Sequence, residues 1–183
     1  MPEERWRCFV AVPIGEELRA SLTSYVEQLR RSPLADEWRW TDPQSWHITL
    51  AFLGSISSAS VPEISGRLEE VASRHTAFTV PTGGLGAFPS IRQARVLWYG
   101  LGDSEGRLAE LAADVRSVLH VNEESPFRAH ITLARIRGSL AGSWTAGIAS
   151  FSAPPPMVKR IALVRSHLGN GPARYYILRE LAL

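Results

Sequence analysis

The sequence predicts an α+β protein with two duplicated lobes of mixed antiparallel sheet, helices on the outer faces and a central cleft. Three observations lead to this prediction. Short β-type segments alternate with longer amphipathic segments along the chain. The pentapeptide His-Ile-Thr-Leu-Ala occurs twice, at residues 47–51 and 130–134. Each copy follows a strand-like and a helix-like segment, which indicates an internal duplication and a pseudo-twofold relation between the lobes.

The predicted strands are short, rich in β-branched or aromatic residues, and bounded by glycine or proline. We interpret the glycine- and proline-rich segment 82–90 as a loop between two of them. No low-complexity linker divides the chain, so we expect one bilobal domain over residues 1–183. The predicted strands are residues 8–13, 46–53, 94–101, 128–136, 158–165 and 174–181.

Three segments carry apolar residues at the spacing of three and four that is typical of an amphipathic helix. They cover residues 15–31, 60–74 and 103–119. The segment 142–151 fits either a short helix or a loop. In the first predicted helix the apolar positions are Leu18, Leu22, Tyr25, Val26 and Leu29.

The composition is that of an ordinary globular protein, with 45% hydrophobic and 21% charged residues in 183. A net charge of +2 is too small to indicate long-duplex binding by counterion release alone. Cys8 is the single cysteine, which excludes an internal disulfide, and it lies in an apolar run where burial is expected. No apolar run reaches the about 18 residues of a membrane span, so we expect a cytoplasmic protein that is not bound to membranes.

The repeated pentapeptide places its polar residues on one side of a strand. Side chains alternate faces with a period of two, so His47 and Thr49 share one face, while the isoleucine and leucine next to them share the other. The same holds for His130 and Thr132 in the second copy. The apolar face packs under a helix. A pseudo-twofold axis between the lobes would then bring two histidines and two threonines into one cleft.

These four side chains suit the opening of a cyclic phosphodiester. The reaction needs a base to activate water and an acid to protonate the departing oxygen, and histidine serves both roles because its ordinary pKa of about 6.5 lies near working pH. Threonine hydroxyls can donate hydrogen bonds to the phosphate oxygens. Because the cyclic ester is strained and open to in-line attack, the reaction does not strictly require a metal or another cofactor.

The paired motifs resemble the two-histidine phosphoesterase superfamily, whose mark is two His-x-Thr-x motifs. Within it the chain is similar to the bacterial and archaeal RNA 2′,3′-cyclic phosphodiesterases, also called 2′-5′ RNA ligases. The likeness covers almost the whole chain. Supporting segments are 7–12, 46–54, 84–89, 94–100, 130–135 and 163–168, followed by Tyr175.

The resemblance implies metal-independent hydrolysis of an RNA-terminal 2′,3′-cyclic phosphate to a 2′-phosphate. It implies that His130 is the proton acceptor from water and His47 the proton donor to the leaving 3′ oxygen. In the reverse direction, the same groups would join a cyclic end to a 5′-hydroxyl through a 2′-5′ bond. The resemblance also assigns phosphate binding to Arg135, which strict alternation would turn away from the histidine, so that a twist or bulge must intervene. Phe9 would either stack on the terminal base or belong to the core.

Three alternatives stay open at this stage. The histidines could be ligands of a metal-dependent hydrolase, although no carboxylate or second cysteine accompanies them. The chain could be a non-catalytic RNA-binding module. The same chemistry could act on another cyclic or 2′-5′ nucleotide, such as ADP-ribose cyclic phosphate. For all of these we expect a monomer whose partner is RNA with a cyclic end or a small cyclic nucleotide.

Overall fold

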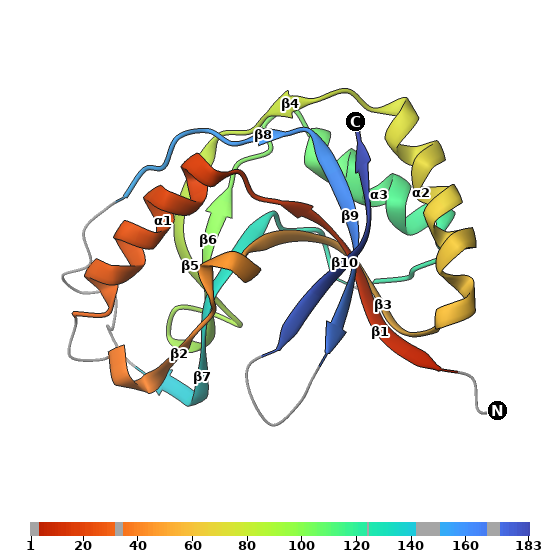
Figure 1. The fold of residues 1–183 in the computed structure, drawn as a ribbon. Coiled ribbons are helices and arrows are strands. Elements are labelled where there is room, and N and C mark those ends of the chain that lie inside the picture. Colours follow the sequence, from red (N-terminus) through yellow and green to blue (C-terminus); the bar gives the residue numbers. More distant parts are fainter. Residues whose placement is uncertain (1–3, 32–34, 124, 142–150, 168–172) are drawn as a thin grey trace.

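The computed structural model describes residues 4–31, 35–123, 125–141, 151–167 and 173–183. Within these ranges the chain forms an antiparallel eight-stranded sheet of order β10-β9-β1-β3-β7-β6-β5, with the short β2 paired to β7 (Figure 1). A small second sheet joins β4 (Phe78–Thr79) to β8 (Met157–Val158). The strands of the main sheet are β1 (Arg5–Pro13), β2 (Trp38–Trp40), β3 (His47–Ser57), β5 (Thr82–Phe88), β6 (Gln93–Leu101), β7 (His130–Ala141), β9 (Arg160–His167) and β10 (Arg174–Ala182).

Three helices in the described ranges cover the sheet, namely α1 (Glu16–Leu29), α2 (Val61–Arg74) and α3 (Arg107–Val118). The predicted helices and the predicted α+β class are confirmed. None of these helices is long and apolar enough to cross a membrane. The apolar stripe predicted for α1 is buried along its whole length, because these side chains fill the space between the helix and the sheet.

The order strand, helix, strand occurs twice, as β1-α1-β3, with the short β2 between α1 and β3, and as β6-α3-β7. In each unit the two named strands pair with one another. The helices are exchanged between the units. Tyr25 and Leu29 of α1 pack against Ala94 and Leu97 of β6, whereas α3 packs against β3. Figure 1 shows α1 beside β5 and β6, and α2 and α3 on the other side of the molecule. This exchange ties the two halves of the sheet together.

The core lies on the helix side of the sheet. Leu50 and Leu133, the fourth residues of the two pentapeptides, are fully buried there with Leu22, Leu68 and Leu111 from the helices. Full burial of one such side chain stabilises the fold by about 1.5–3 kcal/mol relative to exposure. The opposite face of the same strands is left for polar residues.

The interpretation of residues 82–90 as a loop is wrong for most of the segment, because β5 runs from Thr82 to Phe88. The glycines serve packing rather than a turn. Gly86 pairs with Trp98 of β6, and a Cβ atom at Gly86 would lie 2.2 Å from the indole ring. The indole of Trp98 therefore packs over the backbone of Gly86, which has no side chain to block it.

Other differences from the predicted elements concern their lengths. β3 continues to Ser57, past Gly54, which adopts a left-handed backbone with φ 67°. β7 likewise runs past Gly138 to Ala141. The three-residue β2 was not predicted, because so short a segment carries no periodic signal. The ambiguous segment 142–151 lies outside the described residues, apart from Phe151.

Candidate active site

The two motifs meet where β3 and β7 are neighbours in the middle of the sheet. Ile48 pairs with Ile131, the residue after each histidine. Antiparallel pairing on either side of these isoleucines puts His47 opposite Thr132 and His130 opposite Thr49. Each histidine thus faces the threonine of the other motif across a local pseudo-twofold axis.

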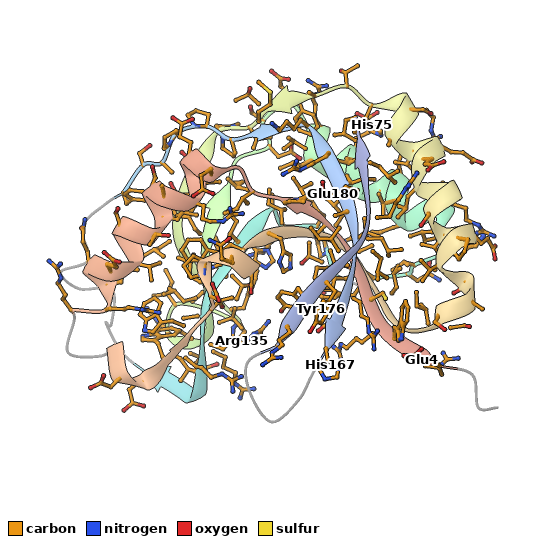
Figure 2. All side chains as sticks on the ribbon, in the orientation of Figure 1. Glu4, His75, Arg135, His167, Tyr176 and Glu180 are labelled. Carbon is orange, nitrogen blue, oxygen red and sulfur yellow. The ribbon has the colours of Figure 1, made fainter. Side chains whose placement is uncertain are left out.

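The polar faces of the motifs line one cleft of about 660 Å³. Both isoleucines are 1% exposed or less and belong to the core, so the alternation along each strand turns the histidines and threonines outward. The β9–β10 hairpin closes one side of the cleft; in Figure 2, Arg135 lies between β7 and the hairpin residues His167 and Tyr176. The residues singled out from the sequence that line this cleft are Phe9, His47, Thr49, His130, Thr132 and Arg135.

Both histidines are oriented in the same way. The Nδ1 atom of His47 lies 2.7 Å from the carbonyl oxygen of Ser45, and that of His130 lies 2.7 Å from the carbonyl oxygen of Arg128. A carbonyl only accepts, so Nδ1 carries the proton and donates it in both rings. In the neutral ring, Nε2 is then the nitrogen that can accept a proton.

The carbonyl that holds His47 belongs to a short 3-10 turn, Pro43–Ser45, just before β3. Asp42 caps this turn by accepting a hydrogen bond of 2.8 Å from the backbone N–H of Gln44. Proline at the first position of the turn suits its fixed φ. The sequence Asp-Pro-Gln-Ser thus fixes the carbonyl that sets the tautomer of the histidine.

Burial lowers the pKa of both histidines, because the charged imidazolium is less well solvated in the cleft. The hydrogen bonds to the Ser45 and Arg128 carbonyls oppose this shift. The charge of His130 lowers the pKa of His47 further, and the charge of Arg135 lowers the pKa of His130. Without a bound anion, both rings therefore favour the neutral form.

Aromatic side chains support each imidazole. Phe9 stacks on His47 with ring centres 4.7 Å apart, and Tyr175 meets the same imidazole edge-on at 5.4 Å. Phe88 lies edge-on to His130 at 5.0 Å. Phe9 is 4% exposed and its face is taken by the imidazole. This placement favours the core alternative for Phe9 over stacking on a base.

A bulge turns Arg135 into the cleft. Consecutive residues of β6 pair with Ala134 and Thr132 of β7, and Leu133 between them is skipped. One extra residue reverses the alternation of faces beyond it. Arg135 therefore shares the cleft side with His130, whereas strict alternation predicted the opposite side.

The first motif has the same irregularity at the same position. Consecutive residues of β1 pair with Ala51 and Thr49, and Leu50 between them is skipped. Phe52, five residues after His47, consequently lines the cleft and is 59% exposed. The two motifs thus present their equivalent positions to one cleft, with phenylalanine in one copy and arginine in the other.

Sequence reasoning assigned no site role to several residues that line the cleft, among them Arg7, Arg39, Phe52 and Tyr175. For Phe52 a signal existed, since its place after the first histidine equals that of Arg135 after the second. The other three carry no local pattern. Three arginines line the cleft, and its described lining contains no Asp or Glu. This charge balance favours an anionic ligand.

Within the described part of the chain, no group of three or more His, Cys, Asp or Glu side chains is arranged to hold a metal ion. Cys8 is buried, as predicted, and burial raises the pKa of its thiol.

Comparisons with known proteins agree with this geometry. A family model described as LigT-like phosphoesterase matches residues 12–98. The RNA 2′,3′-cyclic phosphodiesterase of Thermus thermophilus is 32% identical in sequence, and the matched region covers 97% of this chain and 90% of that protein. The protein of the same name from Aquifex aeolicus is 33% identical, and the matched region covers 68% of this chain and 69% of that protein.

Solved structures show the same fold. The crystal structure of the Thermus thermophilus protein TT0787 has a TM-score of 0.81 and 26% identity, over 97% of each chain. The structure of Escherichia coli LigT complexed with 3′-AMP has a TM-score of 0.73 and 26% identity, over 98% of this chain and 99% of that one.

An antiparallel sheet with two His-x-Thr motifs on one cleft defines the class of two-histidine phosphoesterases. Within this class, both relatives are named RNA 2′,3′-cyclic phosphodiesterase, and each matches more than two thirds of this chain. The chain belongs to the LigT-like phosphoesterase family.

Proposed function

We propose that this protein is an RNA 2′,3′-cyclic phosphodiesterase that hydrolyses the terminal cyclic phosphate to a 2′-phosphate. The observation that carries the proposal is the pair of histidines, each with its Nδ1 held by a carbonyl, on one cleft that contains arginines and no described carboxylate. The names of the relatives support this activity. The complex of Escherichia coli LigT with 3′-AMP supports a nucleotide with a phosphate near its 3′ oxygen.

In the proposed reaction, His130 accepts a proton from water at Nε2 while the water oxygen attacks phosphorus. The negative charge of the bound phosphate favours the protonated form of His47, which carries a proton at Nε2 as well as at Nδ1. The bond between phosphorus and the 3′ oxygen breaks, and His47 donates its Nε2 proton to this oxygen. The products are a 2′-phosphate monoester and a free 3′-hydroxyl. Arg135 binds the phosphate oxygens, and the hydroxyls of Thr49 and Thr132 donate to them.

The asymmetry of the cleft supports this division of roles. Tyr175 meets the His47 imidazole edge-on and can stack on the terminal base, whereas the exposed Phe52 packs on Phe9 and also lines a hollow with Thr49 and His130. The ribose of that base carries the leaving 3′ oxygen, so this oxygen would lie nearer His47. In-line attack then brings water in from the side of His130, while the guanidinium group of Arg135 in the same cleft holds the phosphate oxygens.

We further propose that the reaction proceeds without metal in the cytoplasm, by a monomer in which residues 1–183 form one bilobal domain of duplicated halves. The paired β-α-β units and the repeated bulge support the duplication. Because the roles of the histidines swap in reverse, the same site would join a cyclic end to a 5′-hydroxyl and form a 2′-5′ bond.

The test is to incubate the protein, in excess EDTA, with adenosine 2′,3′-cyclic phosphate and with a short RNA that ends in the cyclic phosphate. We expect turnover in both cases and a 2′-phosphate as the product isomer, which phosphorus NMR distinguishes from a 3′-phosphate. Activity that EDTA abolishes and zinc restores would contradict the proposed mechanism. Tight RNA binding without turnover would identify a non-catalytic module instead.

A further inference from the structure

Arg39 lies next to Arg135 in the sheet. The two residues are register partners between β2 and β7, and both side chains line the cleft. Like charges at directly opposite positions destabilise a strand pair. Both side chains are exposed to solvent in the absence of a ligand. An anion between the two guanidinium groups would turn this repulsion into attraction.

Among the described residues, neither of these arginines has a carboxylate partner or a hydrogen bond. Several arginines elsewhere in the molecule differ in this respect. Arg19 and Arg67 bond to glutamates on their own helices, and Arg116 lies 2.6 Å from Glu123. Arg39 and Arg135 are therefore available to a ligand.

The short strand β2 is built to direct Arg39 into the cleft. Trp38 and Trp40 flank it and take the opposite face by alternation. Trp38 is 7% exposed and packs in the core cluster beneath α1, and Trp40 packs against the same cluster. The backbone N–H of Thr41 donates a hydrogen bond of 2.8 Å to the carbonyl of Leu133, the bulge residue of β7. The buried indole of Trp38, the partly buried indole of Trp40 and this bond therefore fix the position from which Arg39 projects.

The charge in the cleft exceeds what a cyclic phosphodiester needs, since such a group carries one negative charge. Arg135 lies near His130, the proposed base, and so serves the reacting phosphate. Arg39 lies across from Arg135 on β2, which pairs with the same edge of β7 as β3, so the two arginines enter the cleft side by side. A second phosphate of the same substrate would meet it there.

We propose that Arg39, beside Arg135, binds the phosphate on the 5′ oxygen of the ribose that carries the cyclic phosphate. In RNA this group is the phosphodiester to the preceding nucleotide. The inference rests on the proposed function and makes an oligonucleotide end, rather than a free cyclic mononucleotide, the preferred substrate. A 5′-monophosphate or the diphosphate of ADP-ribose cyclic phosphate offers the same chemistry from another source.

The test compares kcat/KM for adenosine 2′,3′-cyclic phosphate with kcat/KM for the adenosine dinucleotide ending in the same group. We expect the wild type to prefer the dinucleotide, and Arg39→Gln to lower the ratio of the two values by about tenfold, the worth of a charge-assisted contact. Arg39→Lys should recover part of the ratio. Arg74→Gln removes the same charge from the exposed end of α2 and should leave the ratio unchanged.

An unchanged ratio in Arg39→Gln would overturn the inference, and so would an equal loss on both substrates, which would assign Arg39 to the reacting phosphate. A wild type that turned over neither substrate would overturn the proposed function itself. Two further substrates separate the sources of the 5′ phosphate. A selective loss on the 5′-phosphorylated cyclic mononucleotide would support a terminal monoester, and one on ADP-ribose cyclic phosphate would support a diphosphate. A loss confined to the dinucleotide supports the phosphodiester of RNA.

Discussion

The two pentapeptides are identical, and their local geometry is nearly identical as well, yet their surroundings differ. Each histidine donates from Nδ1 to the carbonyl two residues earlier, and each motif is bulged at its leucine. The neighbours are not equivalent. His47 is enclosed by Phe9 and Tyr175, with the exposed Phe52 beyond, whereas His130 has Arg135 close enough to influence its pKa.

Under the proposed function, the repeated motif supplies two like proton-transfer groups, and the differences between their neighbours make them unequal. An acid and a base acting on one phosphorus atom need different environments, because one must hold a proton that the other must take. In the proposed mechanism, the difference at a single equivalent position, arginine in one copy and phenylalanine in the other, gives the cleft one residue for the phosphate and one for the base.

The largest effect should come from the histidines. We expect His47→Ala and His130→Ala each to lower kcat by at least about 100-fold, the usual worth of a positioned acid or base. The pH profile of kcat/KM should distinguish them. The decrease of kcat/KM at low pH reports protonation of the base, so the His130 variant should lose it. The decrease at high pH reports deprotonation of the acid, so the His47 variant should lose that one.

Thermal unfolding should show that both histidine variants fold. His120→Ala, at an exposed position outside the cleft, is the matched control. Loss of the same decrease in both variants would break the proposed division of roles. Wild-type turnover in either variant would remove the paired acid–base mechanism altogether.

A smaller effect is expected at the two equivalent positions. Arg135→Gln should lower kcat about 30-fold because the phosphate gains charge in the transition state. Phe52→Ala should raise KM about fivefold with little change in kcat, because stacking on a base contributes about 1 kcal/mol or more to binding without touching the reacting atoms. Steady-state kinetics on adenosine 2′,3′-cyclic phosphate measure both.

Met157→Ala removes a side chain as exposed as Phe52, at 60%, on β8 and outside the cleft, and should change neither constant. If Phe52→Ala lowered kcat and Arg135→Gln raised only KM, the two sides of the cleft would have to be reassigned.

The smallest effect concerns stability. The pKa of both histidines is lower in the folded protein than the ordinary 6.5, so the unfolded chain binds protons first as the pH falls. Above pH 6.5 neither ring contributes to the pH dependence. Below it, the free energy of unfolding should decrease until the folded state also protonates. Urea unfolding between neutral and mildly acidic pH measures this slope.

The double variant His47→Gln with His130→Gln should show a shallower decrease than the wild type over the same pH range. Equal slopes would mean that the two imidazoles titrate alike in the folded and unfolded chains, in contrast to the burial seen in the cleft.

Much of the fold was predictable because its signals are local. The apolar stripe from Leu18 to Leu29 predicts α1, and the stripes of α2 and α3 were equally clear. β5 was missed because its glycines resemble a loop until Trp98 is seen to lie across them. β2 was missed because three residues carry no period.

By itself, the sequence determined the two histidines and two threonines, since an identical pentapeptide on a strand fixes which side chains share a face. The tertiary structure alone decided which other residues join them. The bulges at Leu50 and Leu133 arise from pairing with β1 and β6, and a register shift leaves no trace in the local sequence. The family resemblance named Arg135, but its cleft position, like those of Phe52 and Arg39, depends on strand neighbours that are distant along the chain, so only the assembled sheet could show it.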